Sequence, residues 1–113
     1  FPSVHPLFDT FATSLAMLND ALAERAITLG GLTRGTSRHV AATSTLPDYP
    51  HDVTRDVEHV RLVAERIEKW LEGIRETRIM AEKEGDTDTV DLLTGSVSEF
   101  EKNAWFLRAT LGT

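Results

Sequence analysis

The chain has 113 residues, 41% of them hydrophobic, which is enough for one domain with a core, but no apolar run is long enough to cross a membrane. Its formal net charge is −6 with acids and bases interspersed, which argues against a folded body that grips nucleic acid through a basic face. The absence of cysteine excludes disulfides and thiolate metal sites and leaves oxygen and nitrogen ligands.

The first predicted element is a helix over residues 5–29. Its apolar side chains recur every three or four residues, which is the spacing of one helix face. Ser3 can cap its start and Pro6 suits its first turn, while Gly30 and Gly31 supply the stop.

A long crossing segment and two further long helices are expected to follow. Residues 32–51 contain several turn signals and a short helix over 37–44. Asp52 is then expected to cap a helix that runs to about residue 84, and Gly85 ends it. The last helix begins at residue 86 or 87 and runs to residue 111. Long helices without a strand pattern predict an all-α bundle.

The first helix carries four candidate metal ligands in two matched pairs. His5 and Asp9 are four residues apart, and so are Asp20 and Glu24, so each pair shares one helix face. Asp9 and Asp20 point in nearly the same direction but are separated by a rise of ~16 Å, whereas a metal needs its nitrogen and oxygen ligands at ~2.0–2.2 Å. One helix therefore cannot close one site with all four residues.

A second copy of the helix, antiparallel across a two-fold axis, can close such a site. The outer ligands and the inner ligands share one midpoint, between Ser14 and Leu15. A symmetric interface centred there brings the first pair of one subunit opposite the second pair of the other, twice over. The alternative is that the acids are ordinary solvated side chains and the first pair is helix-start electrostatics. Mixed histidine and carboxylate ligation suits Fe, Mn or Zn.

The other polar and aromatic candidates have plainer interpretations. Asp86, Asp88 and Asp91 cluster at the start of the last helix, where they can cap it and compensate its dipole. The remaining histidines are expected at the surface or in packing, and the tryptophans in the core; these residues are His39, His51, His59, Trp70 and Trp105.

Three long helices are an odd number for a bundle of this size. Their apolar stripes would expose more surface than a soluble monomer usually tolerates. We therefore expect a fourth, N-terminal helix that this chain lacks, so that residues 1–113 form a single domain without its first helix. The start at Phe1 rather than Met agrees with this expectation.

The sequence resembles the Dps family, the DNA-binding proteins from starved cells, within the ferritin-like superfamily. The most specific match is His5-x-x-x-Asp9 followed by Asp20-x-x-x-Glu24-Arg25 and then Leu-Gly-Gly. The resemblance continues through RGTSRHV, LPDYPHDV, EKEGDTDTVDLLT and EKNAWFLRATL, and so covers essentially the whole chain.

This resemblance implies a ferritin-like four-helix bundle that assembles into a hollow dodecamer built on two-fold dimers. It also implies a ferroxidase that oxidises Fe(II) with hydrogen peroxide and stores the ferric mineral. By position, His5 and Asp9 of one subunit and Asp20 and Glu24 of its mate would hold the iron at a di-iron or mono-iron site. Asp86 and Asp91 would line the three-fold pore through which iron enters.

The chain departs from the family pattern in two places. It has no His-Trp pair, although the family's first helix normally supplies a histidine followed by tryptophan. It also has no lysine-rich tail of the kind that often binds DNA. The leading interpretation is a cytoplasmic or nucleoid-associated iron-storing ferroxidase that protects DNA from oxidative damage. The alternative is a DNA-compacting nucleoid protein whose iron site is vestigial.

Overall fold

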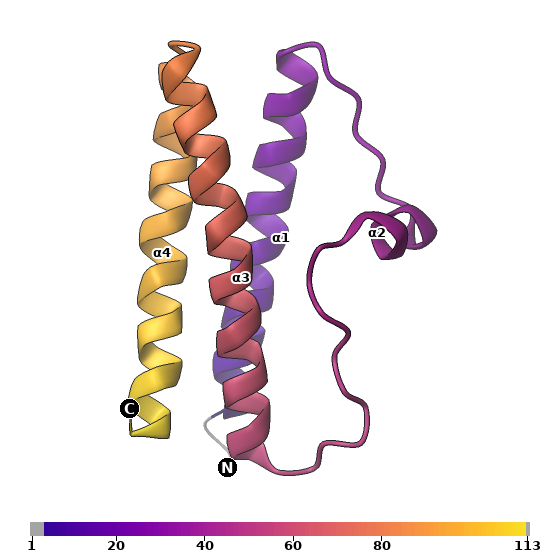
Figure 1. Cartoon of the computed structure of the whole chain (residues 1–113), viewed down its shortest axis with the longest axis vertical. Coiled ribbons are helices and arrows are strands. Elements are labelled where there is room, and N and C mark those ends of the chain that lie inside the picture. The colour runs from indigo at the N-terminus through magenta and orange to yellow at the C-terminus, as the bar shows by residue number, and fades with distance from the viewer. Residues whose placement is uncertain (1–3, 113) are drawn as a thin grey trace. The chain divides into compact units, whose positions relative to one another are not determined.

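The computed structural model describes residues 4–112, and the regular elements in this range are all helices. They are α1 (Val4–Thr28), α2 (Ser37–Thr43), α3 (Asp56–Lys83) and α4 (Thr87–Leu111) (Figure 1). The all-α prediction with a short helix in the crossing segment is confirmed. The chain divides into two compact units, one with α1 and α2 and the other with α3 and α4. Over residues 4–112, no helix is both long enough and apolar enough to span a membrane.

Helix α1 ends in a glycine turn, as predicted. Gly30 adopts φ +91° and donates to the carbonyl of Ile27 at 2.9 Å, while Gly31 donates to Ala26 at 2.8 Å. This pair of bonds satisfies carbonyls that the helix end leaves without partners, and the positive φ suits glycine. The predicted cap at the other end, Ser3, lies outside the described residues.

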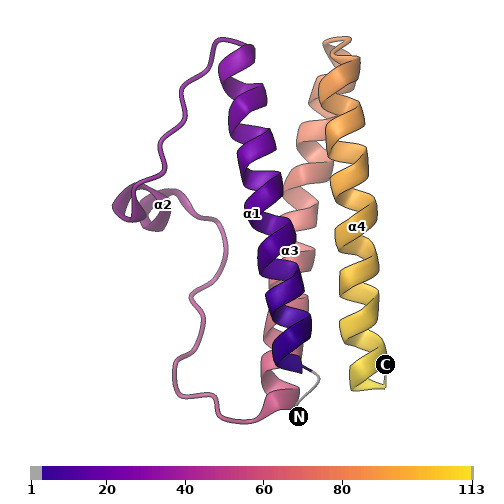
Figure 2. The ribbon, with the colours of Figure 1, turned by 180° about the vertical axis from the view of Figure 1, so that it is seen from behind.

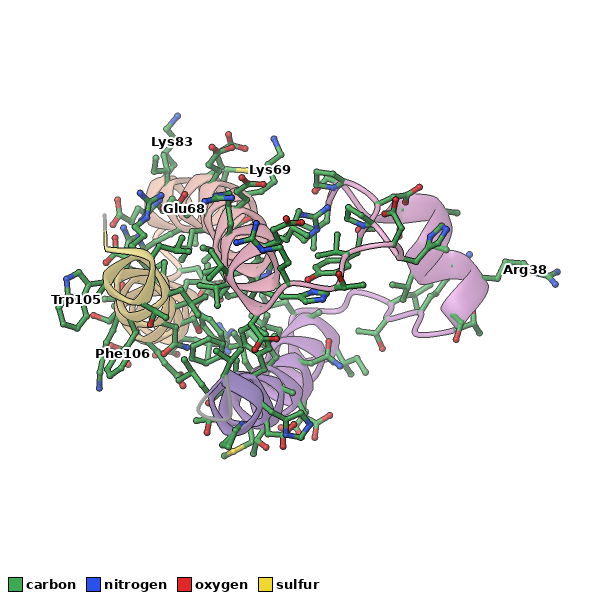
Figure 3. All side chains as sticks on the ribbon, turned by 90° about the horizontal axis from the view of Figure 1, so that it is seen from below. Arg38, Glu68, Lys69, Lys83, Trp105 and Phe106 are labelled. Atoms are coloured by element: carbon green, nitrogen blue, oxygen red, sulfur yellow. The ribbon has the colours of Figure 1, made fainter. Side chains whose placement is uncertain are left out.

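The short helix α2 is capped by a side chain. The Thr36 hydroxyl accepts a hydrogen bond from the backbone N–H of His39 at 3.2 Å. No residue of α2 is buried, and Figure 3 shows Arg38 projecting away from it. The cap and the local backbone bonds therefore define this helix without a buried face.

The start of α3 differs from the sequence prediction. Asp52 was expected to cap this helix, but α3 begins at Asp56, and Arg55 occupies the cap position without a side-chain hydrogen bond. The preceding backbone makes other contacts, since the carbonyl of Val53 bonds to the ring Nε2 of His59 at 3.1 Å. Asp56 and Glu58 then place negative charge in the first turn, where the helix dipole favours it.

Helices α3 and α4 lie side by side and antiparallel, and their facing stripes form the core of the second unit (Figure 2). The Trp70 and Phe100 rings meet edge to face at a centroid distance of 5.0 Å. Among residues 4–112, the largest fully buried side chains all lie in this pair of helices; they are Val60, Leu71, Leu93, Phe100 and Leu107. Burial of these five large apolar side chains is the main force that holds the two helices together.

Two ion pairs cross between the same helices at the surface. Arg75 contacts Glu101 at 2.6 Å, and Arg108 contacts Glu68. All four side chains are 40–53% exposed, so solvent screens both pairs. They help to fix the register of α3 against α4, but they add little to the stability of the core.

Trp105 is not a core residue, contrary to the sequence expectation. Its side chain is 63% exposed, and that of Phe106 is 48% exposed. Figure 3 shows both pointing outward from α4. The neighbouring Ala104 and Leu107 lie on the buried face of α4. Each residue turns a helix by about 100°, so Trp105 points away from that face. Trp70 is partly buried against Phe100, in agreement with a packing role.

Replacing Gly85 by Ala is expected to destabilise the second unit by about 1 kcal/mol. Gly85 has φ +71°, a conformation that strains any residue with a Cβ, although no atom lies within 4 Å of an added Cβ. Gly73→Ala is the matched control, because Gly73 lies within α3 and an added Cβ there also meets nothing within 4 Å. That control is expected to stabilise the protein by up to about 1 kcal/mol. Urea unfolding of both variants measures the two effects, and equal shifts would contradict the strain at Gly85.

Candidate metal centre

The first ligand pair forms in the opening turns of α1. His5 Nδ1 and Asp9 Oδ2 are 3.5 Å apart, and the two side chains are 86% and 70% exposed. The i,i+4 spacing brings the two groups together on one helix face, as the sequence predicted. Both groups are accessible to an ion from solvent, and together they offer one imidazole and one carboxylate.

The second ligand pair lies on the C-terminal half of the same helix. Asp20 and Glu24 are both exposed, and α1 runs without interruption between the two pairs. The described residues contain no cluster of three or more histidine, cysteine, aspartate or glutamate side chains that could hold a metal. The structure therefore joins His5 to Asp9 but does not bring this pair to Asp20 and Glu24 within one chain. This agrees with the rise of ~16 Å expected between Asp9 and Asp20.

The helix surface between the two pairs is made of small or flexible side chains. Ala12, Thr13 and Ala16 are exposed, and Met17 is 70% exposed. On an ideal helix all four point within about 80° of the direction of Asp9. They are also symmetric about the midpoint of the ligand pairs, since Ala12 mirrors Met17 and Thr13 mirrors Ala16. Such a face allows the backbone of another helix to approach closely.

The acids at the start of α4 have distinct surroundings. Asp86 is the N-cap, and its carboxylate accepts hydrogen bonds from the backbone N–H of Thr89 at 3.2 Å and from the Thr89 hydroxyl. The capping interpretation of Asp86 is therefore confirmed. Asp91 is exposed on the following turn and does not cap the helix. The pore role of both residues stays a prediction.

A hydrogen-bonded cluster in the second unit was not found by sequence reasoning. Tyr49 OH lies 2.5 Å from His59 Nδ1, and the two rings are parallel within 5° at a centroid distance of 5.7 Å. The Arg66 guanidinium lies 5.0 Å from the centre of the Tyr49 ring. Burial raises the pKa of Tyr49, and the nearby Arg66 charge opposes that rise. The sequence signal was the seven-residue spacing of His59 and Arg66, which places both on one face of α3.

Comparison with known proteins identifies the protein family of this chain. The ferritin-like domain matches residues 1–113. The DNA protection during starvation protein of Agrobacterium fabrum is 35% identical over 109 residues, which cover 96% of this chain and 67% of that protein. The tetragonal crystal form of Mycobacterium smegmatis Dps gives a TM-score of 0.89 at 28% identity, over 98% of this chain and 67% of that one. This chain belongs to the Dps family of ferritin-like proteins.

The likeness in structure extends to other solved proteins. Antigen TpF1 from Treponema pallidum gives a TM-score of 0.94 at 25% identity, over 100% of this chain and 72% of that one. The chain spans only 58% and 62% of the length of two further curated relatives, from Haemophilus ducreyi and a Nostoc species. The ferritin-like fold predicted from the sequence is thus confirmed.

Proposed function

We propose that this chain forms part of an iron-storing ferroxidase whose metal centre is shared between two subunits. The observation that carries the proposal is the two ligand pairs on α1, which share a midpoint and are separated by a face of small or flexible exposed side chains. Two antiparallel copies of α1 across a two-fold axis would bring His5 and Asp9 of one subunit to Asp20 and Glu24 of its mate. Two equivalent sites would then form at each such interface.

The donor set suits iron as a substrate. Carboxylates are hard, negatively charged ligands that favour Fe(III) over Fe(II), and a neutral imidazole adds one nitrogen donor without further charge. With hydrogen peroxide as the oxidant, two Fe(II) ions give up one electron each, and one peroxide takes up both electrons and two protons to form two waters. The ferric product would accumulate as mineral in the interior of a homo-oligomer, for which we propose a dodecamer.

Protection of DNA would follow from this chemistry rather than from binding to DNA. Several relatives carry the name DNA protection during starvation protein. Joint removal of Fe(II) and peroxide limits hydroxyl-radical formation in the compartment that holds the DNA. The net charge of −6 makes a phosphate-binding surface unfavourable. Tight DNA binding at physiological salt, seen by gel shift together with slow iron oxidation, would favour the alternative of a DNA-compacting protein with a vestigial site.

The direct test is iron oxidation by the metal-free protein. Fe(II) is mixed with stoichiometric peroxide, and ferric absorbance is followed against a protein-free control. Light scattering on the same sample gives the oligomer mass. Oxidation faster than in the control, by an oligomer that keeps its product in solution, supports the proposal. A monomer that leaves the rate unchanged would contradict it.

Asp91→Asn is expected to slow iron uptake severalfold when Fe(II) is scarce, with little effect when it is abundant. A ring of carboxylates at an entry pore raises the local cation concentration, and salt screens this attraction. Asp91 is the better probe of the pore, because Asp86 also caps α4 and its loss would weaken the helix. Glu99→Gln, an exposed position further along α4, is the charge-matched control. If the Asp91→Asn protein takes up scarce Fe(II) at the wild-type rate in a buffer of low salt, Asp91 has no role in entry.

A further inference from the structure

We propose that Tyr49 and His59 form a proton-coupled electron relay that reduces strong one-electron oxidants. Tyr49 would give up an electron while its phenol proton moves to His59, and both would return when the radical is reduced. The pair lies within the second unit and uses none of the four proposed iron ligands. The relay rests on the proposed function only for the Fe(II) that would return the electron in the cell.

The hydrogen bonds assign the proton positions. The carbonyl of Val53 can only accept, so the Nε2 atom of His59 at 3.1 Å from it must carry a hydrogen. In the neutral ring this leaves a lone pair on Nδ1, and Tyr49 OH donates to it across 2.5 Å. The phenol is therefore already hydrogen-bonded to a base before any electron leaves. A tyrosine without such a base must lose its proton to water when it is oxidised.

Arg66 holds the tyrosine in this position. Its guanidinium donates to the carbonyls of Pro47 at 3.3 Å and Asp48 at 2.5 Å, which are the two residues before Tyr49, and to the carbonyl of Leu62 at 3.2 Å. It also lies over the Tyr49 ring. The loop backbone and the phenol are thus fixed to α3 independently of the Tyr49–His59 bond. This preorganisation keeps the donor and acceptor in register as the proton moves.

The site is accessible and chemically distinct. Tyr49 is 40% exposed, so a diffusing oxidant can reach its ring. It is the only tyrosine among the 113 residues, so a tyrosyl radical in this chain can have only one source. Trp105 is more exposed, at 63%, and is the main competing aromatic electron donor at the surface.

The reaction balances with a hydroxyl radical as oxidant. The radical takes one electron from Tyr49 and becomes hydroxide, while the phenol O–H bond breaks and its proton bonds to His59 Nδ1. The products are a neutral tyrosyl radical beside an imidazolium. One Fe(II) then gives an electron and becomes Fe(III), and the proton returns from Nδ1 to the phenolate oxygen. The net result is one hydroxyl radical and one Fe(II) converted to hydroxide and Fe(III).

The test uses a photogenerated ruthenium(III) polypyridyl oxidant and no iron, so its outcome is independent of the proposed ferroxidase. Tyrosyl formation is followed by transient absorption and electron paramagnetic resonance in a Trp105→Phe background. Tyr49→Phe should remove the tyrosyl signal. His59→Gln should slow Tyr49 oxidation about tenfold or more, because the internal base is lost, and added imidazole should restore the rate. His51→Gln, an exposed histidine two residues from Tyr49, should leave the rate unchanged.

Two results would overturn the relay. One is oxidation of Tyr49 in the His59→Gln protein at the wild-type rate, or a slow rate that imidazole does not restore. The other concerns the protein with His59 intact, and it can be measured even if the His59→Gln variant fails to fold. Its rate should not depend on the concentration of added imidazole, since the base is internal. A rate that rises in proportion to imidazole would show that the proton leaves to solvent and not to His59.

Discussion

Replacing Asp20 or Glu24 by Ala is expected to lower the initial rate of Fe(II) oxidation by about 100-fold or more, because loss of a direct ligand should cost at least as much as loss of an outer-shell group. Each residue would supply one carboxylate to a site completed by His5 and Asp9 of the mate. Since both side chains are exposed on α1, their removal should leave the helix content unchanged. Stopped-flow absorbance gives the rate, and circular dichroism gives the helix content.

Glu76→Ala is the matched control for that experiment. It removes the same charge from an exposed position in the C-terminal half of α3, and the variant should oxidise iron at the wild-type rate. A wild-type rate in assembled Asp20→Ala and Glu24→Ala proteins would show that the two acids are only solvated side chains. Equal losses in all three variants would point to a general effect of net charge.

Phe100→Ala is expected to destabilise the second unit by about 3–5 kcal/mol. Phe100 is 0% exposed and its ring meets the edge of Trp70, so truncation leaves a cavity in the centre of the α3–α4 core. Chemical unfolding followed by tryptophan fluorescence measures the loss, since Trp70 should sense the change directly.

Phe106→Ala removes the same kind of side chain from a position nearly two turns further along α4. It is 48% exposed, and its loss is expected to cost about 1 kcal/mol or less, as is usual for surface positions. A similar cost for both substitutions would mean that the α3–α4 contact is not the main stabilising feature of this unit.

The helices were predictable because their signals are local. Apolar periodicity located the three long helices, and the glycines at 30 and 85 marked two helix ends, where the structure shows that both adopt a positive φ. The start of α3 was placed at Asp52 rather than Asp56 because an acidic residue before an apolar run is a common cap signal. In the structure His59 and Arg66 bond to the backbone of the loop before α3, and no local pattern encodes these bonds.

The local part of the candidate site was predictable for the same reason. The i,i+4 spacing gave the His5–Asp9 pair, which the structure confirms at 3.5 Å, and it gave the second pair on the same helix. The meeting of the two pairs at one metal site requires a second subunit and stays a prediction, as does a further helix before this chain. The exposure of Trp105 was missed because hydrophobicity alone does not identify which face of α4 is buried. The Tyr49–His59 bond was missed because it joins a loop to a helix.

The hairpin of α3 and α4 also has a consequence for how the chain folds. A turn of three residues, 84–86, separates the helices, so the first contacts between them close a very short loop and cost little chain entropy. Each further pair of facing residues can then form contacts between helices that are already aligned. Helical proteins rich in such local contacts fold in microseconds to milliseconds. The hairpin should therefore act as an early folding nucleus.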